Sequence, residues 1–288
     1  MTGASLPSAD AGDCLATLRD TDRDRYLACL LAPPQARPAL AALYAFHAEI
    51  ARVRDLAREA LPGEIRLQWW RDVLAGASPE ARSGHPVADQ LLDAINAHDL
   101  PVPVLEAMID ARIFDLYDDP MEDRTALEGY AGETTSALIQ LACLVLDPAA
   151  AARSATAAGH AGVAQAIAGL LLLLPRHRAR GQVYLPGDLL RATGLDRDTF
   201  LAGAPRAAVD AAIRAFVSLG REHLEKARRA AETISAGNIP AFLGVSLCEP
   251  VFRQAERAGT AQMLAPPSPP AQWRRQWRMW RTLRTGRF

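Results

Sequence analysis

Residues 37–58 read RPALAALYAFHAEIARVRDLAR and form the most informative segment of the chain. Large apolar residues recur three or four positions apart, at Leu40, Leu43, Phe46, Ile50 and Val53. This spacing places them on one face of an α-helix, so we predict a helix over residues 37–58. Helical spacing recurs along the rest of the chain, and no stretch alternates apolar and polar residues for long enough to indicate a strand. The predicted fold class is all-α.

Composition limits the function and the cellular compartment. Half of the 288 residues are apolar and the net charge is −1, which argues against a general nucleic-acid binder. Four cysteines are far apart and form no C-x-x-C pair, so we expect a reducing compartment. No apolar run marks the first 13 residues as a secretory signal, and the longest run, 166–175, is shorter than the ~20 residues that span a bilayer. We expect a cytoplasmic protein.

Prolines divide the chain into further predicted helices. Pro33 and Pro34 end a first helix that carries Leu27, and Pro62 is predicted to begin a third. The others are predicted at 85–96, 102–117, 124–146, 149–174 and 205–235. We therefore predict one helical domain over 1–264, a proline-rich linker over 265–271 and an Arg/Trp-rich C-terminal helix over 272–288.

Two segments carry a resemblance to a known family. The first is Ala42-Leu43-Tyr44-Ala45-Phe46, and the second is Gly181-Gln182-Val183-Tyr184-Leu185-Pro186 with Gly187-Asp188-Leu189-Leu190 after it. Weaker landmarks lie between them at Phe114-Asp115-Leu116 and Glu128-Gly129-Tyr130. In this order and separation the segments resemble squalene and phytoene synthases over roughly residues 20–257. The resemblance implies a single-domain isoprenoid-synthase-type helical bundle around a central cavity.

Active members of that family carry two acidic clusters, one on each of two facing helices. Their carboxylates hold Mg²⁺, which neutralises the departing diphosphate of a prenyl substrate. The matching positions here are Ala51, Arg52 and Asp55 in the first motif and Leu173, Arg176 and His177 in the second. A shift of one residue in the second motif gives Leu172, Pro175 and Arg176.

Asp55 is the one acid at these positions in either register. Arginine in place of a carboxylate repels Mg²⁺, so we predict no metal site, no cofactor and no catalytic residue. Residues 118–123 spell DDPMED and resemble a displaced acidic motif. Pro120 would break a helix there, so we favour a solvated turn in which Asp123 caps the next helix.

A narrower resemblance involves EIARVRD at 49–55, LLLPRH at 172–177 and PAFL at 240–243. These stretches resemble the acid-poor, non-catalytic branch that includes the mitochondrial complex I assembly factor. The resemblance implies a role in assembling respiratory complex I, with complex I subunits or assembly intermediates as partners. One alternative is a head-to-head prenyltransferase in which Asp55, Asp115, Asp118 and Asp119 hold Mg²⁺. Another is a protein that binds isoprenoids or anionic lipids.

Several polar residues are candidates for binding a prenyl diphosphate or lipid in such a cavity. A basic mouth would be formed by Arg52, Arg176, His177, Arg178 and Arg180, because guanidinium groups suit phosphate. Asp115 and Tyr130 would line the cavity. The competing interpretation is that these arginines are solvated or paired with carboxylates, and that the interior polar groups pair with one another. Trp69 and Trp70 are expected to serve packing, and His47 and His160 are not expected to bind metal.

The C-terminal segment has a distinct pattern. Residues 272–288 contain six arginines and no acid. Trp273, Trp277 and Trp280 recur at i, i+4 and i+7, and therefore share one helix face. Such a helix is typical of a membrane surface, here the inner face of the cytoplasmic membrane. The equally open alternative is that the tryptophan face packs onto the rest of the protein.

Overall fold

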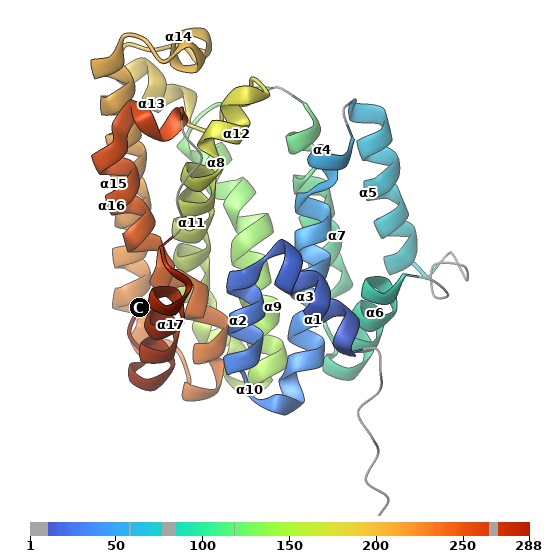
Figure 1. The fold of residues 1–288 in the computed structure, drawn as a ribbon. Helices are drawn as coiled ribbons and strands as arrows, with labels where there is room; N and C mark the ends of the chain where they lie inside the picture. The colour runs from blue at the N-terminus through green and yellow to red at the C-terminus, as the bar shows by residue number, and fades with distance from the viewer. Residues whose placement is uncertain (1–10, 58, 77–84, 118, 265–269) are drawn as a thin grey trace, which may run out of the picture. The chain divides into compact units, whose positions relative to one another are not determined.

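The computed structural model describes residues 11–57, 59–76, 85–117, 119–264 and 270–288. All regular structure in these ranges is helical, which confirms the all-α prediction (Figure 1). Contacts group the helices into two compact units: unit 1 ends at Leu116 and also includes Leu144–Leu146, and unit 2 comprises Tyr117–Cys143 and Asp147–Phe288. The predicted limits of the domain, linker and tail stay predictions, and residues 265–269 of the linker lie outside the described residues.

Unit 1 is built around α3 (Arg37–Ala51), which packs against α1, α2 and α6. Every residue from Ala39 to Ala48 is buried, because the helix is apolar on most of its circumference. The other elements are α1 (Ala11–Thr21), α2 (Arg23–Leu31), η1 (Pro34–Ala36), α4 (Val53–Leu56), α5 (Ala60–Leu74), α6 (Pro86–His98), α7 (Val102–Ala111) and η3 (Phe114–Leu116).

The predicted helix over 37–58 is interrupted at Arg52 and ends early, at Leu56. Helix α3 ends at Ala51, Arg52 is its C-cap, and the chain continues as the single turn α4 before Ala57 becomes extended. Pro62 lies in the first turn of α5 rather than at its first residue. Proline is tolerated there because backbone N–H groups of a first turn have no partner within the helix. The predicted helix over 102–117 ends at Ala111.

Unit 2 is centred on α11 (Ala155–Leu172) and α15 (Arg206–Arg229), which pack against each other and against α16 (Cys248–Ala258). Gly220 permits this approach, since a Cβ atom there would lie 2.5 Å from Cζ of Phe252. The remaining elements are α8 (Arg124–Ala131), η4 (Gly132–Ser136), α9 (Ala137–Leu146, whose last three residues belong to unit 1), α10 (Pro148–Ala151), η5 (Ala152–Ser154), α12 (Leu174–Ala179), α13 (Gly187–Ala192), α14 (Arg197–Ala202), η6 (Ala230–Thr233), η7 (Ala236–Leu247), η8 (Gly259–Met263) and α17 (Gln272–Thr285).

Within the described residues, length and apolar composition would allow one segment, Pro148–Leu172, to span a membrane. Over half of its apolar window, 56%, is buried inside the protein. Core helices meet the same criteria, so this segment carries no argument for a membrane span.

Candidate functional site

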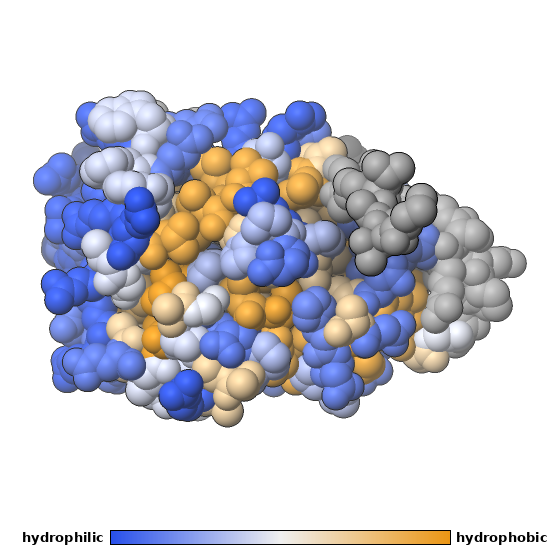
Figure 2. All heavy atoms as spheres, turned by 90° about the horizontal axis from the view of Figure 1, so that it is seen from below, coloured by the Kyte–Doolittle hydropathy of each residue, from blue (hydrophilic) through white to orange (hydrophobic). Residues whose placement is uncertain are grey.

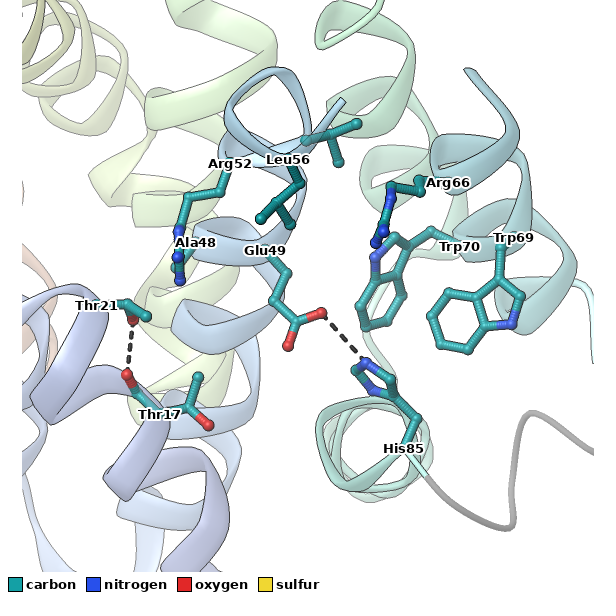
Figure 3. Close-up of a pocket in the computed structure, with 11 residues that line it drawn as sticks. Thr17, Thr21, Ala48, Glu49, Arg52, Leu56, Arg66, Trp69, Trp70 and His85 are labelled. Atoms are coloured by element: carbon teal, nitrogen blue, oxygen red, sulfur yellow. Dashed lines mark hydrogen bonds and ion pairs between the residues drawn. The ribbon is translucent and has the colours of Figure 1, made fainter. Parts of the chain in front are cut away.

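The first degenerate motif lies where α3 gives way to α4. Arg52 is exposed at this junction, and Asp55 is half-buried in the single turn that follows. The junction borders a groove of about 410 Å³ within unit 1 (Figure 3). The groove is lined by Thr17, Thr21, Ala48, Glu49, Arg52, Val53, Leu56, Arg66, Trp69, Trp70 and His85.

The acid that lines the groove is Glu49, and it is already paired. Its Oε2 lies 3.3 Å from Nε2 of His85, and Figure 3 shows the two side chains pointing toward each other. The hydrogen bond to Glu49 raises the pKa of His85, against the opposing effect of burial. Among its described lining residues the groove has the guanidinium groups of Arg52 and Arg66 and one carboxylate, that of Glu49. Its chemistry suits an anion better than Mg²⁺.

Aromatic rings form the wall of the groove beside His85. The ring centroids of Trp69 and His85 are 4.9 Å apart, and those of Trp70 and His85 are 5.4 Å apart. Trp70 is buried and packs edge-on against Phe46 with centroids 5.0 Å apart, whereas Trp69 is half-buried. These contacts confirm the packing role predicted for the tryptophan pair.

Asp115 belongs to a buried polar network in unit 1. Its Oδ2 accepts a hydrogen bond of 3.0 Å from Nη1 of Arg112, whose Nη2 lies 3.2 Å from Nε2 of His47. On the other side of the imidazole, Nη1 of Arg25 lies 3.1 Å from Nδ1 of His47 and donates to Asp22 at 2.8 Å. Burial, followed by Arg25 and Arg112, holds the pKa of His47 well below its usual value. Asp115 therefore pairs with an arginine inside the fold, as the competing interpretation from sequence holds.

The second degenerate motif lies in unit 2, at the junction of α11 and α12. Leu173 caps α11 and is exposed, Arg176 is exposed, and His177 is buried. The His177 ring packs on Tyr184 with centroids 4.6 Å apart, and Tyr184 lies 6.0 Å from Tyr130. The structure thus brings together two predicted site residues, His177 and Tyr130, through an aromatic residue of the YLP landmark.

Arg180 is the C-cap of α12, and Arg52 and Asp115 belong to the other unit. Neither register of the second motif contains an acidic residue, so the conclusion that this motif lacks carboxylates does not depend on the alignment. Among the residues that the structure describes, no group of three His, Cys, Asp or Glu side chains is placed to hold a metal ion.

The DDPMED segment behaves as a helix start. Asp123 is the N-cap of α8, and its Oδ1 accepts a hydrogen bond of 2.9 Å from the Ala126 N–H, which confirms the predicted cap. Asp119 and Glu122 are exposed, and Asp118 lies outside the described residues.

Sequence reasoning missed the Glu49–His85 pair and Arg66. A signal for His85 was present, because Pro86 is well suited to a first helical position and the residue before it is the N-cap. The Nδ1 of His85 accepts from the Ala88 N–H at 3.4 Å. The partner of His85 could not be found from spacing, since Glu49 lies on another helix.

The chain is similar to known proteins in both sequence and fold. The family model described as squalene/phytoene synthase matches residues 18–281. The NADH dehydrogenase (ubiquinone) complex I, assembly factor 6 of Homo sapiens is 32% identical over 259 residues, which are 89% of this chain and 78% of that protein.

Two solved structures share the fold. A dehydrosqualene synthase in complex with a ligand aligns with a TM-score of 0.77 and 15% identity over 96% of this chain and 95% of that chain. The squalene synthase HpnC from Alicyclobacillus acidocaldarius aligns with a TM-score of 0.68 and 19% identity over 87% of this chain and 94% of that one.

Proposed function

Because this chain belongs to the squalene/phytoene synthase family yet keeps one acid among six motif positions, we propose that it is a non-catalytic member that acts in assembly of respiratory complex I. The observation that carries the proposal is the loss of those acids. Without a nest of carboxylates, Mg²⁺ is not held against a diphosphate and the allylic cation does not form.

The surroundings of the motif residues support this proposal. At the first motif, Arg52 lines a groove in which the carboxylate of Glu49 is paired with His85. At the second motif, His177 is packed against Tyr184. The prenyltransferase alternative needs Asp115 as a substitute metal ligand, yet Arg112 already pairs with this carboxylate in the interior of unit 1.

The assembly role rests on the named relatives. The human relative is named as a complex I assembly factor and is matched over most of both chains. We propose that this chain likewise contacts complex I subunits or assembly intermediates, at the inner face of the cytoplasmic membrane. Its activity would then be binding, with no cofactor.

Catalysis is tested with labelled farnesyl diphosphate, the full chain and Mg²⁺, with an active squalene synthase as positive control. We expect release of diphosphate to stay at the level of the protein-free blank. Magnesium-dependent turnover above that blank would establish the enzyme and contradict the proposal.

The assembly role is tested by deleting the gene and measuring assembled NADH dehydrogenase on native gels, together with hopanoid and carotenoid content. We expect less assembled complex and unchanged isoprenoid products. Complementation with Asp55→Asn, which removes the last acid of the first motif, should restore the complex as well as the wild-type chain does. Loss of complementation by this variant, or a normal complex after deletion, would refute the proposed role.

A further inference from the structure

Helix α17 is fixed to unit 2 by one narrow face. It packs against η7, and its buried side chains are Met279, with no exposed surface, and Thr282, which is 2% exposed. The helix ends at Thr285 with Gly286 as its C-cap, and beyond it the ring of Phe288 stacks on Phe242 with centroids 5.9 Å apart. The orientation of the helix about its own axis is therefore set by packing.

This orientation turns the tryptophans outward. Trp273, Trp277 and Trp280 are 64%, 58% and 42% exposed, and the last two stack with centroids 5.0 Å apart. The structure thus contradicts the alternative in which the tryptophan face packs onto the rest of unit 2. Three indole rings on one exposed helix face form a surface of the kind found at membrane–water interfaces, where the ring is half in apolar surroundings and its N–H is solvated.

Arginines surround these rings. The guanidinium carbon of Arg274 lies 5.2 Å from the Trp273 ring centroid, and that of Arg284 lies 5.5 Å from the Trp280 centroid. The left-hand part of Figure 2, on the side where Figure 1 shows α15, α16 and α17, is largely hydrophilic. The tryptophans therefore belong to a mixed cationic and aromatic face rather than to a broad apolar patch.

The positive surface extends beyond α17 into an adjoining groove of about 670 Å³. Arg228 of α15 and Arg253 of α16 line the groove together with arginines of the helix. Its lining includes one acid, Glu249, which accepts from Arg253 at 2.8 Å and lies 3.5 Å from Arg221. Arg228 also lies 3.7 Å from Glu225, yet the arginines that line the groove outnumber these acids, so the groove is positive.

We propose that α17 and this groove dock the protein on the surface of an anionic phospholipid bilayer. The indole rings lie at the level of the headgroups, and the guanidinium groups bind lipid phosphates, for which their planar fork is suited. Charge complementarity and the row of exposed amphipathic rings on α17 favour a bilayer over a folded protein partner. The docking surface goes beyond the proposed assembly role and does not depend on it.

The test is co-sedimentation of the full chain with vesicles of phosphatidylcholine alone or of phosphatidylcholine mixed with phosphatidylglycerol. We expect binding to the anionic vesicles that weakens as salt is raised, and little binding to the neutral ones. Variant Arg274→Gln/Arg278→Gln/Arg281→Gln should bind on the order of 100-fold more weakly, because each arginine near an anionic surface strengthens binding about fivefold.

A matched control is Arg153→Gln/Arg191→Gln/Arg214→Gln, which changes the net charge equally at exposed arginines of unit 2 outside α17. It should keep most of the binding. Variant Trp273→Ala/Trp277→Ala/Trp280→Ala should lose both sedimentation and the blue shift of tryptophan fluorescence. Its melting curve should change little, since the buried side chains of α17 are Met279 and Thr282. The proposal would be overturned if the control variant lost binding to the same extent, or if the wild-type chain did not sediment with anionic vesicles at low salt. It would also be overturned if the wild-type chain bound an acidic protein but did not bind vesicles.

Discussion

Replacing His47 with glutamine removes a buried titrating group from unit 1. The imidazole lies between the guanidinium groups of Arg25 and Arg112, at 3.1 and 3.2 Å. Burial and these two cations lower its pKa, so the folded chain keeps His47 neutral. Glutamine retains a carbonyl that can accept from one arginine but binds no proton.

The size of the effect follows from proton linkage. In the unfolded chain the imidazole has a pKa of about 6.5, so roughly a quarter of chains carry the proton at about pH 7 and nearly all do at about pH 5. The folded chain does not take up this proton, and the unfolded state therefore gains stability as the pH falls. His47 accounts for a loss of up to about 2 kcal/mol in the free energy of unfolding between these pH values.

The assay is thermal or urea unfolding of the wild-type chain and His47→Gln at the two pH values. The expected result is a stability difference that shifts in favour of the variant by up to about 2 kcal/mol on going from neutral to mildly acidic pH. His85, whose pKa is raised by Glu49, has the opposite dependence, since its contribution is lost as the pH rises. Because His85 is present in both proteins, its contribution cancels in the difference between their free energies of unfolding. A difference that does not change with pH would refute the reasoning.

Two further predictions concern buried groups. Asp115→Leu should destabilise the protein by about 3 kcal/mol because it leaves Arg112 buried without this carboxylate. The double variant Arg112→Met/Asp115→Leu should lose less stability than the sum of the two single variants. Additive losses, measured by urea unfolding, would count against a coupled pair. Burial raises the pKa of Cys29, Cys143 and Cys248 to about 12, so these thiols should react with a disulfide reagent near pH 8 only after unfolding; rapid labelling of the native chain would contradict this.

Periodicity predicted most of the long helices because their apolar faces are local properties of the sequence. Helix α15 keeps one buried face through Val209, Ile213, Phe216 and Leu224, as the spacing indicates. The break between α3 and α4 was missed, since Arg52 and Val53 continue the helical pattern through it. The 3-10 segment η7, which contains Pro240, was missed too, because its twelve residues depend on packing against α11, α16 and α17.

The candidate site was predicted unevenly. The charge of both motifs follows from residue identity and holds in the folded chain. The partners of the motif residues did not follow, because Glu49 meets His85 and His177 meets Tyr184 through contacts between different elements. Asp115 and its partner Arg112 lie three residues apart, yet only burial makes their pairing matter.

The sequence alone determined the helical class, the family and the missing carboxylates, since each depends on the order and chemistry of residues along the chain. Only the tertiary structure decided which way the α17 tryptophans face, because a helix that carries both arginines and tryptophans can dock by more than one side. The orientation of α17 is fixed by its packing on η7, with Met279 and Thr282 as its buried side chains. Which face a helix buries depends on the shape of the surface that receives it, and that surface is assembled from distant parts of the chain.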